Sequence, residues 1–380
     1  MKNQIKNTNS ITKMLFNMMV SLPAPSSISY MWNWGSMLGI MMFMQIMTGL
    51  LLASHYNPSI MEAFNSIIHI NREINNGWML RFLHMNGSSI LFIMIYMHIS
   101  RGMLFNSFKM MNTWMSGLIM LLLLMGISFL GYVLPWGQMS FWGATVITNL
   151  ATAIPYLGES LVKWLWGGFS INNATLNRFF MLHFLMPFML LMMIIIHLAF
   201  LHLTGSSTPL GLNNNKDKIP FYPYFIVKDM MSLFMLLMMI FLIMFINPNI
   251  MSDPENFNMA NPLSTPMHIQ PEWYFLFAYA ILRSIPSKLG GVMALLMSIM
   301  SLMMLPFMKK MTTSSKFMPI KKYTFWLFSM NFIILSWIGA NPVEYPFEMT
   351  GKIFSMTYFM LLFMLCFFLF VLKTKYKVML

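Results

Sequence analysis

Four histidines lie inside long apolar stretches of the sequence, where an ionisable side chain is costly to bury and usually marks a functional site. His84 and His98 share one stretch, and His183 and His197 share another, with 14 residues between the members of each pair. At about 100° and 1.5 Å per residue, this spacing places both histidines of a pair on one helix face, about 21 Å apart along the axis.

The two histidine pairs are suited to holding haem iron. One further apolar stretch separates the two helices, so they run parallel, and His84 then faces His183 while His98 faces His197. Two facing imidazoles without a nearby Cys, Asp or Glu favour bis-histidine ligation of haem over zinc, which prefers four ligands. For a single histidine, a hydrogen bond between helices is the alternative. The matched spacing predicts two stacked b-type haems.

Glycines recur at the same spacing on the neighbouring apolar stretches. Gly35 and Gly49 are 14 residues apart, and so are Gly117 and Gly131. A flat macrocycle between helices needs backbones without side chains at its own depth, although glycine is also common in membrane helices generally. The predicted helix directions place Gly35 with Gly117 at one haem level and Gly49 with Gly131 at the other.

Two arginines lie close to predicted haem ligands. Arg81 precedes His84 by three residues, and Arg101 follows His98 by three. Each guanidinium is expected to pair with a haem propionate. The alternative for either arginine is a side chain that extends along apolar surface to the membrane interface.

The composition requires a membrane environment for these elements. The chain is 58% hydrophobic and 9% charged, with a mean hydropathy of +0.66. Soluble domains contain about 25% charged residues, so a water-soluble enzyme, a disordered protein and a secreted disulfide scaffold are excluded. A membrane-spanning helix needs about 20 apolar residues. Eight stretches qualify: 33–53, 77–104, 113–134, 177–203, 227–246, 289–308, 323–340 and 353–372.

These spans predict an all-α polytopic membrane protein with eight transmembrane helices. The first four form a haem-binding four-helix bundle within a domain of residues 1–210, and the other four belong to residues 211–380. Residues 135–176, which are broken by proline and glycine, predict short interfacial helices. Residues 253–288 predict a loop that lines a binding site, with a short helix from Trp273 to about Leu282.

The charge distribution predicts the orientation. An even number of spans puts both termini on one side, called the N side here, and the opposite side is called the P side. Most of the basic residues behind the net charge of +13 fall on the N side. The positive-inside rule then places the N side in the cytoplasm or the mitochondrial matrix. The basic run at 309–322 is explained as a topology signal, and we expect no binding of nucleic acid.

Two motifs accompany the histidine pairs. They are the segment Gly131-Tyr132-Val133-Leu134-Pro135-Trp136-Gly137-Gln138 and the segment Pro271-Glu272-Trp273-Tyr274. With these motifs, nearly the whole chain resembles the mitochondrial cytochrome b family, the dihaem subunits of ubiquinol–cytochrome c oxidoreductase, or complex III. The unbroken chain and the equal ligand spacings favour the respiratory form over the photosynthetic one.

The resemblance implies a redox enzyme subunit that works in a quinone cycle. Quinol is oxidised on the P side, quinone is reduced on the N side, and electron transfer through two b haems is coupled to proton translocation. The implied partners are the Rieske iron-sulfur protein, cytochrome c1, other complex III subunits, ubiquinol and ubiquinone, membrane lipid, and a second copy in a homodimer. The implied location is the mitochondrial inner membrane, with both termini in the matrix.

The resemblance also assigns residues to the P-side quinol site. The catalytic positions are Glu272, Tyr132 and Tyr279, and the walls are Met139, Gly143, Ile147, Pro271 and Phe275. A carboxylate at a partly buried helix start can accept a proton released by quinol and then turn toward water. The alternative role for Glu272 is stabilisation of the helix dipole after Pro271.

The family pattern assigns further residues to quinone reduction and to the haems. The N-side quinone site is implied at His202, Ser206, Lys228 and Asp229, and Ser107 is implied as a haem contact. The alternative for the four quinone-site residues is ordinary helix capping and interface charge. The segment 203–208 departs from the vertebrate pattern at Leu203, Ser207 and Thr208, which changes the hydrogen bonds available at this end.

Two other classes of protein could use intramembrane histidines. A dihaem anchor of another quinone-linked dehydrogenase would also need stacked histidine pairs, but it explains neither the last four spans nor the motif at 271–274. A transporter with a His and Glu proton relay predicts broken spans, for which Pro187 is the best candidate, and no haem absorbance.

Overall fold

The computed structural model describes residues 20–211, 215–307, 314 and 317–376. Part of the predicted N-side basic charge, including Lys309, Lys310 and Lys316, lies outside the described residues. The first four long helices are α2 (Trp34–Ala53), α4 (Gly77–Leu104), α5 (Met111–Val133) and α8 (Asn173–Thr204). Each lies within a few residues of a predicted span, because charge, proline or glycine ends the apolar run in the sequence as it ends the helix in space.

The second half contains four more helical rods, which are α9 (Tyr224–Ile246), α11 (Lys288–Met300) continued by the 3-10 helix η7 (Ser301–Phe307), α12 (Pro319–Gly339) and α13 (Phe347–Tyr376). Among the described residues, six helical segments are long and apolar enough to cross a membrane; α12 and α13 are not among them. In α12 the polar residue Asn331 faces α13 and donates a hydrogen bond of 2.5 Å to Thr357. A polar contact between helices lowers the hydropathy of a helix without exposing the polar group to lipid.

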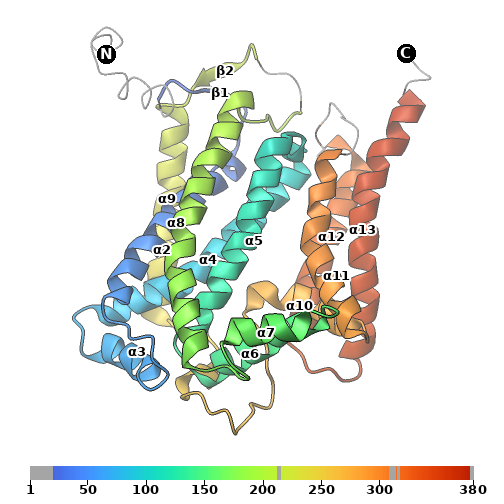
Figure 1. Cartoon of the computed structure of the whole chain (residues 1–380). Helices are drawn as coiled ribbons and strands as arrows, with labels where there is room; N and C mark the ends of the chain where they lie inside the picture. Colours follow the sequence, from blue (N-terminus) through green and yellow to red (C-terminus); the bar gives the residue numbers. More distant parts are fainter. Residues whose placement is uncertain (1–19, 212–214, 308–313, 315–316, 377–380) are drawn as a thin grey trace.

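The long helices pack in pairs that position the histidines. The most extensive contacts in the first half join α2 to α4 and α5 to α8, and in the second half α12 packs on both α10 (Leu276–Ser284) and α13. Figure 1 shows the first four rods side by side, with α12 and α13 at the far edge of the molecule. Pro187 lies inside α8, which continues past it to Thr204.

Short elements close the two ends of the molecule. At one end lie α3 (Ala63–Arg72), α6 (Gln138–Asn149) and α7 (Gly158–Trp166), as Figure 1 shows. At the other end, where α13 also ends, β1 (Pro23–Pro25) pairs antiparallel with β2 (Lys218–Pro220). The short helices of the region 135–176 were predicted, whereas α3 and the strand pair were not.

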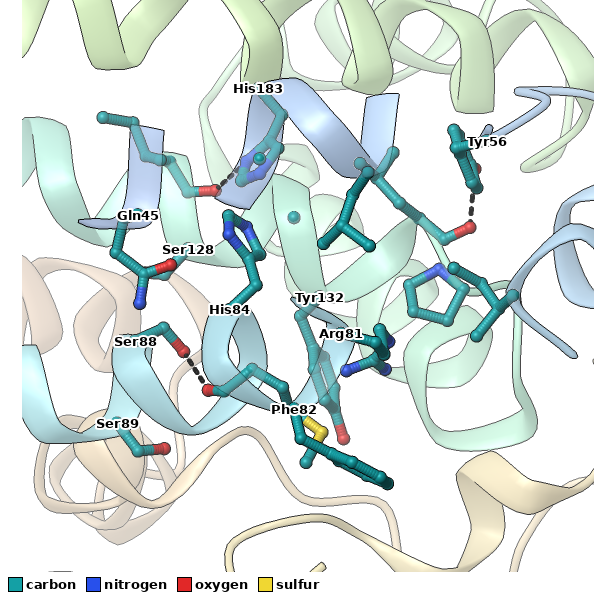
Figure 2. A pocket seen from close by; sticks show the side chains of 18 of the residues that line it. Gln45, Tyr56, Arg81, Phe82, His84, Ser88, Ser89, Ser128, Tyr132 and His183 are labelled. Carbon is teal, nitrogen blue, oxygen red and sulfur yellow. Dashed lines mark hydrogen bonds between the residues drawn. The ribbon is translucent and has the colours of Figure 1, made fainter. Parts of the chain in front are cut away.

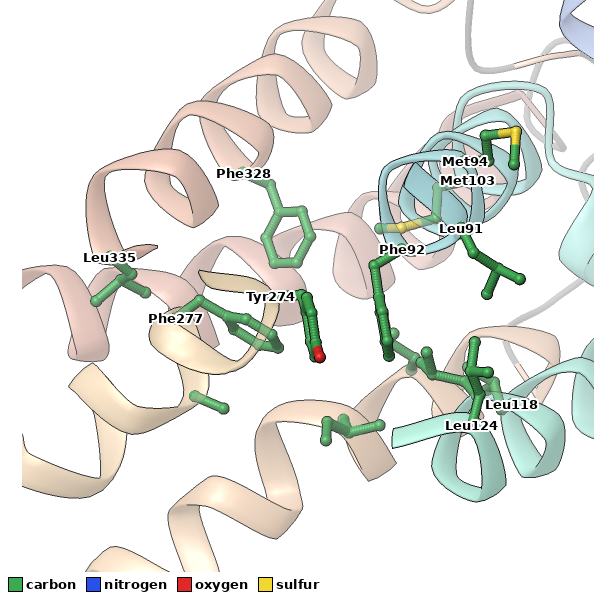
Figure 3. Close-up of a cluster of buried hydrophobic side chains, with 14 of the residues drawn as sticks. Leu91, Phe92, Met94, Met103, Leu118, Leu124, Tyr274, Phe277, Phe328 and Leu335 are labelled. Carbon is green, nitrogen blue, oxygen red and sulfur yellow. The ribbon is translucent and has the colours of Figure 1, made fainter. Parts of the chain in front are cut away.

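The predicted loop helix is present, and it packs into the core of the protein. It begins as the 3-10 helix η6 (Trp273–Phe275) and continues as α10. The Tyr274 ring stacks on Phe92 of α4 at a centroid distance of 3.9 Å, and the Tyr96 hydroxyl donates a 2.6 Å hydrogen bond to the Tyr274 carbonyl. Figure 3 shows this stack inside the main apolar cluster. The loop that carries Glu272 is therefore fixed to the helix that carries His84.

Candidate functional site

The imidazole rings of the two histidine pairs face each other between α4 and α8. The centroids of His84 and His183 are 6.2 Å apart, and those of His98 and His197 are 6.5 Å apart. A metal–imidazole bond of about 2.0–2.1 Å places the centroids of two opposite ligands roughly 6.4 Å apart. Both separations therefore fit one iron held between two rings. Figure 2 shows the first pair.

Hydrogen bonds fix the orientation of three of these rings. The Nδ1 atom of His183 lies 2.8 Å from the carbonyl oxygen of Ile127, which can only accept, so Nδ1 carries the proton. The Thr48 hydroxyl lies 2.9 Å from Nδ1 of His84, and the Ser116 hydroxyl lies 2.9 Å from Nδ1 of His197. Each hydroxyl donates its own proton to a helix carbonyl, so it can accept a hydrogen bond from the ring. In each of the three rings Nε2 is left as the atom that can ligate a metal.

The four predicted glycines lie against the four histidines. A Cβ atom would stand 3.5 Å from the His98 ring at Gly35, 3.1 Å from the His84 ring at Gly49 and 3.3 Å from the His197 ring at Gly117, and it would clash with the His183 ring at Gly131. The glycines thus make room for the imidazole rings themselves. The levels predicted from the 14-residue spacing agree with these contacts.

Buried donors surround the second pair. The Arg101 guanidinium lies over the Trp32 ring at 5.3 Å, and its Nη2 is 3.2 Å from Nδ1 of His98. Within the described part of the chain, Arg101 Nε and the indole nitrogens of Trp32 and Trp34 are buried without a hydrogen-bond partner. Unpaired buried donors of this kind suit an anionic group such as a haem propionate. Haem therefore fits the residues at this level too.

A cavity of about 470 Å³ surrounds the first pair, which is within the usual size of ligand sites. Both rings line it, together with groups from three other parts of the chain. The lining includes His84, His183, Arg81, Tyr132, Asp253 and Glu272. Figure 2 shows Arg81 and Tyr132 beside the two rings. A proton-accepting group and a redox-ligand pair thus share one chamber.

Glu272 is a carboxylate of this chamber whose pKa is raised. It precedes η6, outside the long helices. Burial raises the pKa of Glu272 to about 7. The Tyr132 hydroxyl and the Arg81 charge oppose that rise, whereas the Asp253 charge adds to it. A carboxyl group that titrates near neutral pH is suited to general acid–base chemistry.

Comparison with known proteins agrees with this geometry. Residues 19–205 match a family model described as "Cytochrome b/b6/petB", and residues 259–359 match one described as "Cytochrome b(C-terminal)/b6/petD". A solved chain titled "Hyperthermophilic respiratory Complex III" is 30% identical, with a TM-score of 0.91 over 98% of this chain and 99% of that chain. This chain belongs to the cytochrome b family. Membership implies b-type haem binding and supports a role in electron transfer within a respiratory complex.

The other residues predicted for the quinol site lie outside the chamber of Glu272. Met139 is buried in α6, and a Cβ atom on Gly143 would meet open space. Phe275 packs on Tyr274 at 4.6 Å. The Tyr279 hydroxyl donates to the carbonyl of Ile269 at 3.3 Å. The predicted residues without a place in the chamber lining are Met139, Gly143, Ile147, Pro271, Phe275 and Tyr279.

The turn between α5 and α6 is joined to the loop that follows α9. Trp136 adopts a positive φ of 55°. Its carbonyl accepts a 3.0 Å hydrogen bond from the Ala260 amide, and the Gln138 amide donates to the Asn258 carbonyl at 3.0 Å. The bond from Ala260 joins the two segments that match the family models, and the bond to Asn258 ends one residue before the second segment.

At the predicted quinone-reduction end of this cytochrome b, two of the four residues contact the start of α2. The Ser36 hydroxyl donates to Asp229 Oδ1 at 2.7 Å, and Lys228 Nζ donates to the Ile28 carbonyl at 3.0 Å. The Asn33 side-chain amide also donates a 3.0 Å hydrogen bond to the Lys228 carbonyl of α9. Sequence reasoning missed Ser36 and Asn33; their position one turn or less from the α2 start was the available signal.

His202 lies in the last turn of α8, and Ser206 follows that helix. Within the described residues, neither makes a hydrogen bond to Lys228 or Asp229. Ser107, the implied haem contact, is buried, and its hydroxyl lies 2.7 Å from that of Ser207. The loop after α4 is thereby tied to the segment that departs from the vertebrate pattern.

Proposed function

We propose that this chain is the electron-transfer subunit of a quinol–cytochrome c oxidoreductase of the complex III type, with two b haems stacked across the membrane. The observation that carries the proposal is the geometry of the two imidazole pairs, with centroid separations of 6.2 and 6.5 Å and a glycine against each ring. A hydrogen-bond role alone does not require four clearances at matched depth. His84 with His183 would hold the P-side haem, and His98 with His197 the N-side haem.

The bound haems would supply one-electron transfer, with each iron held by two histidines. The chain contributes orientation: the Ile127 carbonyl and the hydroxyls of Thr48 and Ser116 fix three rings with Nε2 available. Arg81 and Arg101 would neutralise propionates. Arg101 Nη2 can only donate to Nδ1 of His98, which leaves the ring proton on Nε2. For His98 to bind iron through Nε2, the Arg101 guanidinium must therefore turn away from Nδ1, toward a propionate.

On the P side, Glu272 would accept a proton from quinol. Its carboxylate has a raised pKa, so above pH of about 7 it is ionised and can act as a base. Tyr132 would donate to that carboxylate, and Tyr279 would contact the quinol. Met139, Gly143, Ile147, Pro271 and Phe275 would form the walls of its site, and a Cβ atom on Gly143 would meet no neighbour within 4 Å.

On the N side, Lys228, Asp229 and His202 would supply protons to a reduced quinone, and Ser206 would help to bind it. The Ser36 hydroxyl donates a hydrogen bond to Asp229 Oδ1. This bond would hold the Asp229 carboxyl group in place for proton transfer. Uptake of protons here and release at Glu272 would make the reaction translocate protons across the membrane.

The setting of this activity is also proposed. All eight predicted spans would cross the membrane, including α12 and α13, which are long enough to do so. The basic excess supports placing both termini on the N side. The resemblance to the mitochondrial family supports the mitochondrial inner membrane, with the N side in the matrix. The Rieske protein, cytochrome c1 and other complex III subunits would be partners, ubiquinol would be the substrate, and two copies would form a homodimer.

A difference spectrum tests the proposal. Membranes that contain the chain are reduced with dithionite, and the absorption is compared with that of the oxidised sample while haem is quantified against the polypeptide. Two low-spin b haems per chain are expected. A chain without haem contradicts the proposal and favours the transporter with a histidine and glutamate relay.

A further inference from the structure

Asn256 occupies the contact between the 3-10 helix η5 (Pro254–Phe257) and the start of α6. Its side-chain Oδ1 accepts a 2.9 Å hydrogen bond from the Ser140 backbone amide, and its Nδ2 donates a 2.9 Å hydrogen bond to the Tyr132 hydroxyl. Gly137 is required beneath it, because a Cβ atom there would stand 2.6 Å from Oδ1. Both ends of the amide are therefore engaged.

The bond to Ser140 determines which end of the amide faces Tyr132. A backbone N–H can only donate, so the atom toward Ser140 is the oxygen and the atom toward Tyr132 is the NH2 group. The Tyr132 oxygen thus accepts from Asn256, and its own proton must point to a different acceptor. Tyr132 and Glu272 line the same chamber, so the Glu272 carboxylate is an acceptor within that chamber toward which the Tyr132 proton can point.

We propose that Asn256 is a positioning residue that orients the Tyr132 hydroxyl as a donor to Glu272. This inference rests on the proposed quinol oxidation and assigns a role to a residue outside the family motifs at 131–138 and 271–274. Asn256 does not touch the reacting atoms. It stabilises the ionised carboxylate through Tyr132, in the form that can accept a proton from quinol.

Other groups also act on the Glu272 carboxylate, so the test must change the amide alone. Asp253 lies in the same loop, Arg81 reaches the chamber from α4, and Tyr274 follows Glu272 in η6. Asn256→Asp leaves all of them in place. It keeps the acceptor for Ser140, and the new carboxyl group can donate to Tyr132 when protonated but not when ionised.

Quinol oxidation by the intact complex is measured across pH for Asn256→Asp and for the natural chain. The ratio of variant to natural rate is expected to fall about tenfold from acid to alkaline pH, because the donor is lost on ionisation. Asn258→Asp is the matched control, since it adds the same charge two residues away at an exposed side chain. Its ratio is expected to stay constant. A constant ratio for Asn256→Asp, or an equal fall for Asn258→Asp, overturns the assignment.

A double-mutant cycle supplies the second test. Asn256→Ala and Tyr132→Phe are measured singly and together, in samples whose haem spectra match the natural chain. If Asn256 acts through Tyr132, its substitution has little further effect in the Tyr132→Phe chain; independent, multiplicative losses contradict the proposal. Failure of the natural complex to oxidise quinol would instead refute the proposed function, so the two failures are distinguishable.

Discussion

A Cβ atom on Gly49 would lie 3.1 Å from Cε1 of His84, a ring on the neighbouring helix. This contact leaves no space for a branched side chain. Gly49→Val is expected to displace the ring and remove the P-side haem. The overpacking should also lower the stability of the fold by about 1–3 kcal/mol. The haem content per chain should fall from two to one in the reduced-minus-oxidised spectrum. Gly39→Val, on the same helix with open space at its Cβ position, should keep both haems.

Removal of one ligand should eliminate one haem. His183→Leu is expected to abolish the P-side haem and quinol oxidation, because His84 would lose the facing imidazole with which it would hold the haem. The spectrum should retain the N-side haem. His69→Leu, an exposed histidine on α3, serves as the control. Two intact haems in the His183→Leu chain would refute the ligand pairing.

The pH dependence of quinol oxidation should follow Glu272. Its pKa is raised to about 7, so the group is protonated below that pH and ionised above it. If the ionised form is the base, the rate rises with pH through about 7. Glu272→Gln should lower the rate by about tenfold or more and flatten that rise while haem content stays normal. Glu344→Gln, at an exposed position, should retain the natural profile.

The contact between Ser36 and Asp229 predicts a graded effect on quinone reduction. Asp229→Asn should strongly slow re-oxidation of the N-side haem by added quinone. Ser36→Ala, which removes one 2.7 Å hydrogen bond, should slow it by about three- to tenfold. Stopped-flow absorption in the haem band measures both. Ser54→Ala, near the other end of α2, should have no effect; equal rates for Ser36→Ala and the natural chain would remove Ser36 from the site.

The residues predicted from sequence are those whose position depends on helix geometry alone. The 14-residue spacing fixes the relative depth and face of two side chains on any straight helix. The facing rings of His84 and His183 and the glycines against them follow from that regularity. The boundaries of α4 match the predicted span 77–104 because composition changes sharply there.

The missed features depend on contacts between distant segments. Asn256 and Tyr132 are 124 positions apart, and Ser36 and Asp229 are 193 apart, so no local pattern brings them together. Helix α3, with ten residues, is too short for a search based on membrane spans. The strand β1 contains two prolines, which local propensity assigns to loops.

The turn at Trp136 lies in the first half of the chain, and its hydrogen-bond partners lie in the second half, which is synthesised later. A positive φ at a bulky residue is a strained conformation, of about 1–3 kcal/mol, that needs support from its surroundings. That support is the backbone bonding to 258–260, which a ribosome makes more than 100 residues later. All four histidines precede this segment. A nascent chain can therefore complete its histidine pairs first, whereas the chamber beside Glu272 closes only after the second half has been made.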